Sequence, residues 1–118
     1  MAGEKMGWPE IGEKIGLEVS ESRAEQGIVF CWTGTGVSIA ANKVHGVRAA
    51  LSWDAETAKG ARLWDDANVL AISLRATSPA VAKEILDAWF STKPESTGTD
   101  AELIQRAKDL DRKHRSTA

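Results

Sequence analysis

The sequence has one cysteine, two histidines, no tyrosine and no long apolar run, and these shortages exclude several classes of protein. A single cysteine among 118 residues excludes an internal disulfide. No apolar run approaches the length of a membrane span, and the charged N-terminus lacks the apolar segment of a secretory signal. We therefore expect a cytoplasmic protein with no membrane partner.

A large excess of charge is also absent. The chain has 15 basic and 17 acidic residues, which gives a formal net charge of -2. This balance offers no electrostatic reason to expect a nucleic-acid partner, and the one basic cluster, at residues 112–115, is predicted to be a solvated helix end. The remaining composition, 42% hydrophobic and 27% charged, is typical of one globular domain with a small core.

The spacing of apolar residues predicts alternating strands and helices. Strands are expected at the apolar runs 28–31, 47–51 and 69–74. Helices are expected at residues 9–23, 37–43, 54–63 and 78–90, and from Thr99 onward. Strands separated by helices imply right-handed crossovers and a parallel sheet, so we predict an α/β sandwich. Three strands leave edges exposed, and a second copy, a partner subunit or a further segment is expected to cover one.

The most informative segment is residues 27–43, in which an apolar strand ends at Cys31 and enters a turn that contains Gly34 and Gly36. Glycines let a backbone approach a ligand closely, so a thiol beside this turn is a candidate reaction site. The structural alternative is that a lone cysteine ending a strand is a small buried packing residue. Nucleotide binding is not expected, because Ile39 replaces the third glycine of a dinucleotide fingerprint and Lys43 lacks the preceding glycine of a Walker A loop.

Histidine and tryptophan are two further residue types that can contact a metal or a substrate. His45 and His114 have no metal-ligand spacing with the cysteine or with paired carboxylates, so no metal is expected. Of the five tryptophans, Trp8 and Trp89 are predicted to lie in the core. The other three are expected either to pack or contact another subunit or, as the less favoured alternative, to stack on sugar rings; they are Trp32, Trp53 and Trp64.

Three blocks of sequence carry a resemblance to a known family. Residues 27–43 match its pattern of an apolar strand, a cysteine, a glycine-rich turn and Ser-Ile-Ala-Ala-Asn-Lys. Residues 46–51 and residues 66–70, with Arg75 a few positions on, follow in the same order. The chain thereby resembles the sugar-phosphate isomerase family that contains type B ribose-5-phosphate isomerase and the subunits of galactose-6-phosphate isomerase.

The resemblance implies a Rossmann-like, three-layer sandwich and an aldose-ketose isomerisation through an enediolate. Cys31 would be the catalytic base, with Thr33 beside it. The backbone N–H groups that follow would form an anion hole, at Gly34, Thr35, Gly36, Val37 and Ser38. The implied substrate is a phosphorylated sugar, no cofactor is implied, and the implied assembly is a homodimer or a higher oligomer.

The chain also departs from the family pattern. The family domain begins with two further strand and helix units, the first of which ends in an Asp-His pair linked to ring opening, and this chain starts after them. Trp64 and Asp65 stand where the family has a His-Asn or similar pair, and residues 95–102 contain no arginine for a phosphate. Residues 1–94 are therefore interpreted as a truncated isomerase-like domain, and residues 95–118 as a linker and a charged helix. The alternative function is a non-catalytic or partner-dependent subunit, and a gene-start error is a third reading.

Overall fold

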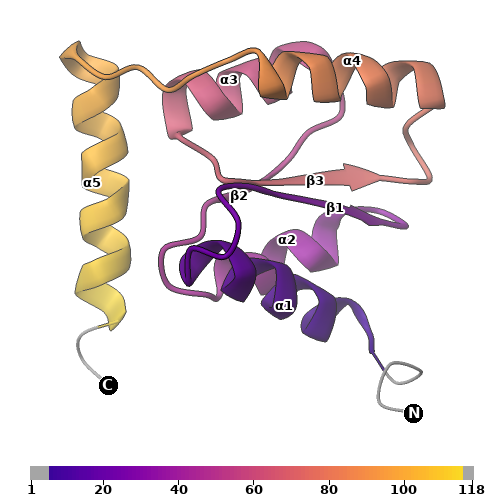
Figure 1. The fold of residues 1–118 in the computed structure, drawn as a ribbon, viewed down its shortest axis with the longest axis horizontal. Helices are drawn as coiled ribbons and strands as arrows, with labels where there is room; N and C mark the ends of the chain where they lie inside the picture. Colours follow the sequence, from indigo (N-terminus) through magenta and orange to yellow (C-terminus); the bar gives the residue numbers. More distant parts are fainter. Residues whose placement is uncertain (1–5, 116–118) are drawn as a thin grey trace.

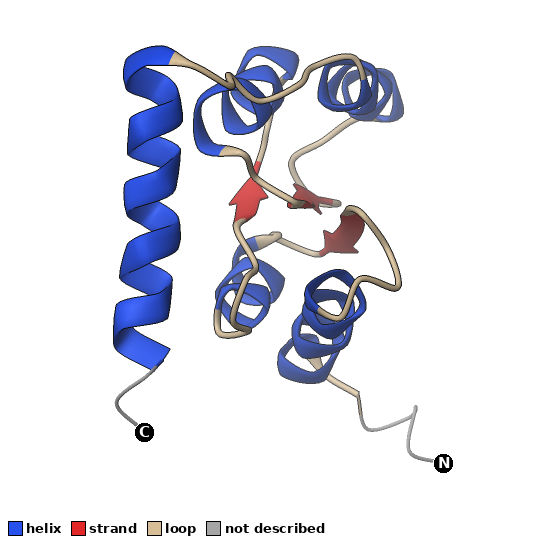
Figure 2. Cartoon of the chain, turned by 60° about the vertical axis from the view of Figure 1, so that its left-hand side comes forward, coloured by secondary structure: helices blue, strands red, loops and turns tan. Residues whose placement is uncertain are grey.

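The computed structural model describes residues 6–115 and contains a parallel sheet between two layers of helices. Along the chain the elements are α1 (Trp8–Ser20), β1 (Gly27–Cys31), α2 (Thr35–Asn42), β2 (Ala49–Leu51), α3 (Ala55–Asp65), β3 (Val69–Ser73), α4 (Pro79–Phe90) and α5 (Gly98–Arg115). The strands are arranged in the order β1-β3-β2. Helices α1 and α2 cover one face of the sheet and α3 and α4 the other (Figures 1 and 2). The predicted α/β sandwich is confirmed.

The central strand β3 corresponds to the uninterrupted apolar run at residues 69–74 of the sequence. All five of its residues are buried, because both of its faces are covered by helices. Val69 and Ala71 pack with Val29 and Val37 on the α1 and α2 side. On the α3 and α4 side the core is formed by Leu70, Ile72, Ile85 and Trp89, with smaller alanines between them. Burying a side chain such as Leu70 contributes about 1.5–3 kcal/mol to stability.

Short side-chain caps begin two of the helices, as the sequence predicted. The Asp54 carboxylate accepts a hydrogen bond of 2.8 Å from the Thr57 N–H at the start of α3. The Ser78 hydroxyl oxygen accepts one of 3.2 Å from the Val81 N–H, and a proline follows it in the first turn of α4. These contacts satisfy backbone donors that a helix leaves free at its first turn.

The start of β2 and the position of Trp8 differ from the prediction for identifiable reasons. Strand β2 begins at Ala49 rather than at residue 47, because the Arg48 N–H bonds to the Asn68 side chain and the Arg48 carbonyl accepts from the Asn68 N–H. Trp89 is fully buried as predicted, but Trp8 is 49% exposed and does not belong to the core. Trp8 lies at the very start of α1, where its ring covers the glycine at position 36 instead.

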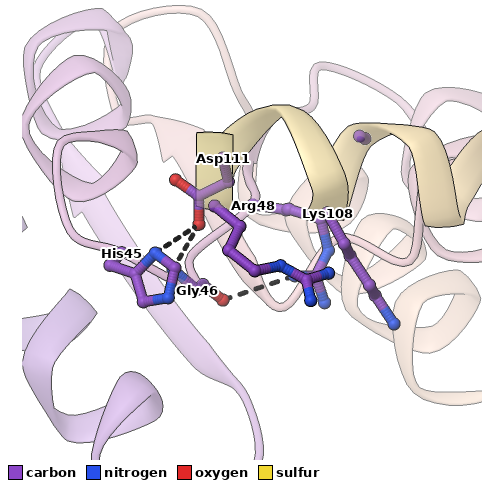
Figure 3. Close-up of a pocket in the computed structure, with 7 residues that line it drawn as sticks. His45, Gly46, Arg48, Lys108 and Asp111 are labelled. Atoms are coloured by element: carbon purple, nitrogen blue, oxygen red, sulfur yellow. Dashed lines mark hydrogen bonds and ion pairs between the residues drawn. The ribbon is translucent and has the colours of Figure 1, made fainter. Parts of the chain in front are cut away.

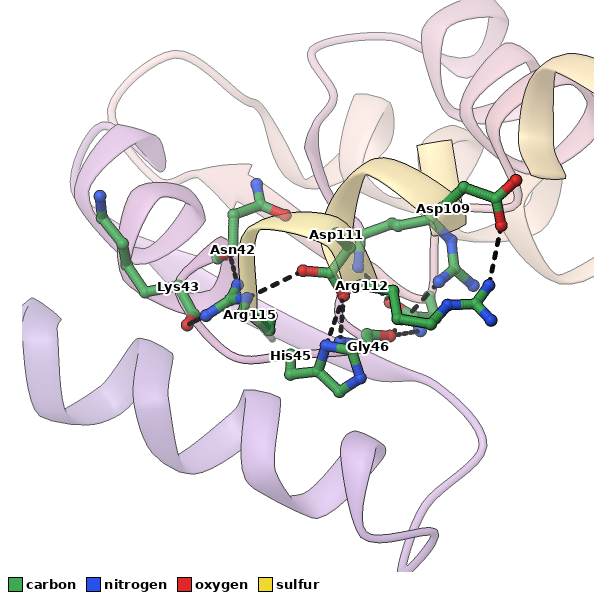
Figure 4. A network of polar contacts seen from close by, with 10 residues as sticks. Asn42, Lys43, His45, Gly46, Asp109, Asp111, Arg112 and Arg115 are labelled. Carbon is green, nitrogen blue, oxygen red and sulfur yellow. Dashed lines mark hydrogen bonds and ion pairs between the residues drawn. The ribbon is translucent and has the colours of Figure 1, made fainter. Parts of the chain in front are cut away.

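Helix α5 lies beside the amino ends of the strands and is attached there by polar contacts (Figure 1). Asp111 accepts a 2.8 Å hydrogen bond from the Gly46 N–H, and its carboxylate also lies 3.0 Å from His45 Nδ1 (Figure 3). Arg115 donates to the carbonyls of Asn42 and Lys43 at the end of α2 (Figure 4). None of the helices within residues 6–115 is both long enough and apolar enough to span a bilayer.

Candidate functional site

The candidate site lies at the carboxyl ends of the strands. Cys31 is the last residue of β1, and α2 begins four residues later at Thr35. The turn between them is tight because Gly34, which caps α2, has φ = 82°. Parallel strands direct their carboxyl ends to one edge of the sheet, so the ends of β2 and β3 lie at the same edge as Cys31.

The backbone of this turn acts on the Cys31 thiol. Hydrogen bonding from the backbone of Gly34 lowers the pKa of Cys31 below its ordinary value, burial opposes this, and the amides of Thr33, Val37 and Trp32 lower it further. The residue is half-buried and packs against the core on the α1 and α2 side of the sheet. A thiol in such surroundings is more readily ionised, and the thiolate is the basic and nucleophilic form.

Two glycines in the turn are required by what packs against them. A Cβ at position 34 would come within 2.5 Å of Leu51 Cδ1 and 3.3 Å of the Ser73 N atom. A Cβ at position 36 would lie 2.7 Å from the ring of Trp8. Side chains at either position would therefore push the turn away from its neighbours. The two glycines hold the donor groups near the end of β1.

The hydroxyl groups that the sequence placed in the site are engaged with one another or with the backbone. The Oγ1 atoms of Thr33 and Thr35 lie 2.8 Å apart, and both residues are exposed. The Ser38 hydroxyl donates a 2.8 Å hydrogen bond to the Gly34 carbonyl. Its proton is thus directed at the first turn of α2, while its oxygen retains lone pairs that can accept a hydrogen bond.

Arg75 was matched in sequence, but no role followed from the sequence alone. The turn after β3 is held against the end of β1, because Leu74 and Arg75 donate from their N–H groups to the carbonyls of Cys31 and Trp32, at 2.8 Å and 2.9 Å. The Ser73 hydroxyl donates to the same Trp32 carbonyl at 3.1 Å. This places an exposed arginine in the segment next to the thiol turn. The approach of Arg75 to the thiol turn follows from the strand register, which pairs Cys31 with Ser73. This register is known only from the folded sheet.

Other candidate residues lie elsewhere. His45 precedes β2 and contacts Asp111, so it lies at the amino end of the sheet, away from Cys31. Within residues 6–115, no three histidine, cysteine or acidic side chains are grouped so that they could hold a metal ion. Trp32 and Trp53 follow the ends of β1 and β2 and are 65% and 63% exposed. Trp64 lies on α3 with its ring against Gly60 and is 56% exposed.

This chain is similar in sequence to proteins of a known family. The sequence model of the family described as Ribose/Galactose Isomerase matches residues 2–107. Ribose-5-P isomerase B of Listeria innocua is 36% identical over 112 residues, which cover 95% of this chain and 75% of that protein. D-erythrulose-4-phosphate isomerase of Pectobacterium atrosepticum is 36% identical over 97 residues, which cover 82% of this chain and 64% of that protein.

A solved structure gives the same result for the fold. Ribose-5-phosphate isomerase B of Clostridium thermocellum superposes with a TM-score of 0.87 at 34% identity, over 92% of this chain and 73% of that one. The chain therefore spans roughly two thirds to three quarters of the length of these relatives. The residues matched by the family model include the turn after Cys31. The chain belongs to the ribose/galactose isomerase family.

Proposed function

We propose that this chain carries the proton-transfer centre of an aldose-ketose isomerase that acts on a phosphorylated sugar. The observation that supports it most directly is the Cys31 thiol, half-buried and held in a turn whose backbone amides lower its pKa. The relatives are named for isomerisation of ribose 5-phosphate and of D-erythrulose 4-phosphate, so the substrate class is a short phosphorylated sugar. The expected setting is the cytoplasm.

In the proposed reaction the Cys31 thiolate removes a proton from the carbon next to the carbonyl of the open-chain sugar. The electron pair of that C–H bond forms the C–C double bond of the enediolate, and the carbonyl oxygen becomes negative. The hydroxyl proton on the adjacent carbon then passes to the negative oxygen, and the thiol returns the first proton to the former carbonyl carbon. The carbonyl has thereby moved by one position, and Cys31 is again a thiolate. No external oxidant or reductant is needed. A positioned base of this kind contributes about 10²–10⁴-fold to the rate.

The negative oxygen is assigned to the amides of residues 34–37. The Ser38 N–H, which the resemblance also implied, instead donates a 3.4 Å hydrogen bond to the Gly34 carbonyl. Backbone N–H groups at the start of a helix stabilise an anion, and they do so without rearranging during the reaction. Thr33 is assigned a hydroxyl contact to the sugar. Arg75, in the neighbouring turn, is assigned the substrate phosphate, because a guanidinium can bind two phosphate oxygens at once.

A second candidate is a partner-dependent subunit that keeps the fold but does not turn over alone. It is favoured by the position of His45, which contacts Asp111 at the amino end of the sheet and is distant from the thiol turn. A cyclic sugar must be opened before isomerisation, and that step needs an acid or a base near the ring oxygen. In this candidate the ring-opening group comes from another polypeptide within a homodimer or a larger oligomer.

The test is to measure isomerisation of ribose 5-phosphate and of other pentose and hexose phosphates by the purified chain. For an active chain, Cys31→Ala should lower kcat by about 10²–10⁴-fold, and His45→Gln, at the opposite end, should leave it unchanged. The rate of thiol alkylation against pH should show an inflection below pH 9.0, the ordinary pKa of a cysteine. Turnover that survives Cys31→Ala would remove the first candidate. A folded chain with a reactive thiol and no turnover would favour the second.

A further inference from the structure

A cavity of about 320 Å³ lies between α5 and the loop that precedes β2 (Figure 3). Of the described residues that line it, four are basic and one is acidic: His45, Arg48, Lys108, Arg112 and Asp111. Its volume is at the lower end of the range for small-molecule sites. Because the loop before β2 is at the amino ends of the strands, this cavity is separate from the candidate site at Cys31.

One carboxylate is shared by three cations beside this cavity. Asp66 lies 3.3 Å from Arg48, 3.6 Å from Arg62 and 3.2 Å from Lys108. A single negative charge cannot neutralise three positive charges, so two positive charges remain in excess although each cation has a partner. Arg48 and Lys108 line the cavity, and their side chains are partly exposed. The excess positive charge is therefore presented to the cavity.

The acidic residue in the lining does not remove this excess. Asp111 accepts a 2.8 Å hydrogen bond from the Gly46 N–H, and its carboxylate lies 3.0 Å from Arg115 Nε (Figure 4). Arg115 neutralises Asp111 from outside the lining, so Asp111 leaves the charges of Arg48 and Lys108 uncompensated. The chain as a whole has a formal net charge of -2. The positive excess is thus a local property of this cavity.

The two central cations also retain N–H donors. Arg48 donates from Nε to the Asp66 carbonyl, from Nη2 to the Asp66 carboxylate and from Nη1 to the Gly46 carbonyl. A guanidinium has five N–H groups, so within residues 6–115 each terminal nitrogen keeps one for a ligand. Lys108 has three N–H groups and is paired with Asp66 alone among the described residues. Guanidinium and ammonium groups together are well suited to a phosphate, which accepts several charge-assisted hydrogen bonds.

We propose that this cavity binds a phosphate group, either free phosphate or the phosphate ester of a small metabolite. Arg48 belongs to the loop before β2 and Lys108 to α5, so one anion held by both joins the helix to the loop. A phosphate dianion matches the excess of two positive charges around Asp66. The proposal is independent of catalysis, and the site is additional to the phosphate contact assigned to Arg75 at the other end of the sheet.

The test is a titration of the full chain with inorganic phosphate, followed by ¹H–¹⁵N amide spectra at constant pH and ionic strength. We expect saturable shifts of the amides of Gly46, Arg48 and Lys108. Shifts confined to the turn after Cys31 and to Arg75 would overturn the proposal, because phosphate would then bind only at the other end of the sheet. The absence of any saturable shift would overturn it as well.

Two variants separate a built site from general attraction between charges. Lys108→Gln removes a cation from the cavity and should raise the dissociation constant for phosphate about tenfold. Lys83→Gln is the matched control, because Lys83 is also paired with an aspartate but lies on α4, and it should leave the constant unchanged. Equal effects of the two variants would overturn the proposal. If Lys108→Gln loses helix, as judged by circular dichroism, the amide shifts of the unmodified chain decide the question.

The source of the phosphate group is identified by comparing three compounds in the same titration: inorganic phosphate, glycerol 3-phosphate and glycerol. Glycerol 3-phosphate has no carbonyl group, so isomerisation at Cys31 cannot consume it. Tighter binding of glycerol 3-phosphate than of inorganic phosphate would assign the site to a phosphorylated metabolite, and equal or weaker binding would assign it to free phosphate. Glycerol should not shift the amides of Gly46, Arg48 and Lys108. Shifts by glycerol as large as those by its phosphate would overturn the proposal, because the phosphate group would then not be recognised.

Discussion

The two ends of the sheet are stabilised by different kinds of contact. At the carboxyl end, the environment of Cys31 is made by backbone amides and by glycines that pack closely. At the amino end, α5 and the loop before β2 are joined by charged side chains, above all through Asp66 and Asp111. Backbone dipoles are fixed by the fold and can interact with an incoming anion, whereas the charged groups at the other end are already paired with one another. Polar side chains attach α5 at the second end, and the reactivity that we propose belongs to the first.

The largest expected contrast in stability is between glycines at the two ends. Gly34→Ala should lower the free energy of unfolding by about 2–4 kcal/mol, because a Cβ there meets Leu51 at 2.5 Å and the backbone has φ = 82°. Gly46→Ala has a similar φ of 86°, but its Cβ finds the nearest atom at 4.0 Å, so it should cost about 1–2 kcal/mol. Urea denaturation measures both. Equal costs would show that the turn can move away from Leu51.

The next largest effect concerns Asp66, which joins three cations at the amino end. Its carboxylate lies 3.3 Å from Arg48, 3.6 Å from Arg62 and 3.2 Å from Lys108. Asp66→Asn keeps a side chain that tolerates the residue's φ of 49° but leaves the nearly buried Arg62 with one charge partner fewer, so we expect a loss of about 1–3 kcal/mol.

The control for Asp66 is the exposed pair of Lys83 and Asp87 on α4. Their charged groups lie 2.7 Å apart with side chains 77% and 66% exposed, so Lys83→Ala should leave the free energy of unfolding nearly unchanged. Neither variant should change the rate of Cys31 alkylation. Faster or slower alkylation in Asp66→Asn would mean that the two ends of the sheet are coupled.

A smaller effect should appear in the pH dependence of stability at the carboxyl end. Because the folded pKa of Cys31 is below that of the unfolded chain, the folded state binds fewer protons between the two values. Stability should therefore rise with pH through this window, be complete above about pH 9, and be lost as pH falls through the folded pKa. The measurement is the difference in unfolding free energy between the unmodified chain and Cys31→Ala from pH 6 to pH 9.5. A difference that does not vary with pH would indicate that the amides do not favour the thiolate.

The smallest effect is expected for the exposed contact of His45 with Asp111. The His45 side chain is 60% exposed, and the Asp111 carboxylate keeps its bond to the Gly46 N–H without it. His45→Gln should cost less than about 0.5 kcal/mol in thermal or urea unfolding. A loss above 1 kcal/mol would show that attachment of α5 depends on this side chain more than on the backbone contact.

Much of the fold could be predicted because local patterns agreed with the tertiary arrangement. The apolar run of β3 is buried on both faces, and Asp54 and Ser78 cap the helices that their positions indicated. The extent of β2 was overestimated, because Arg48 is held outside the ladder by Asn68, twenty residues away. Trp8 was misplaced because its neighbour, Gly36, belongs to another helix.

The candidate site could be predicted from the sequence only in part. The cysteine and the glycine turn are contiguous, so a single segment of sequence contains them. The segment of Arg75 approaches through hydrogen bonds between neighbouring strands, and the separation of His45 from the thiol follows from strand direction. Neither of these two spatial relations can be predicted from the spacing of residues along the chain.

The order of residues by itself determined two features: the alternation of strands and helices, and the presence of a thiol next to a glycine-containing turn. Both depend on side-chain type and on neighbours a few positions away. Only the tertiary structure decided that β3 lies between β1 and β2, that Leu51 and Ser73 crowd the turn after β1, and that α5 lies at the opposite end of the sheet. Those outcomes depend on contacts between segments far apart in the chain, where register and packing select one arrangement among many that the same local preferences allow.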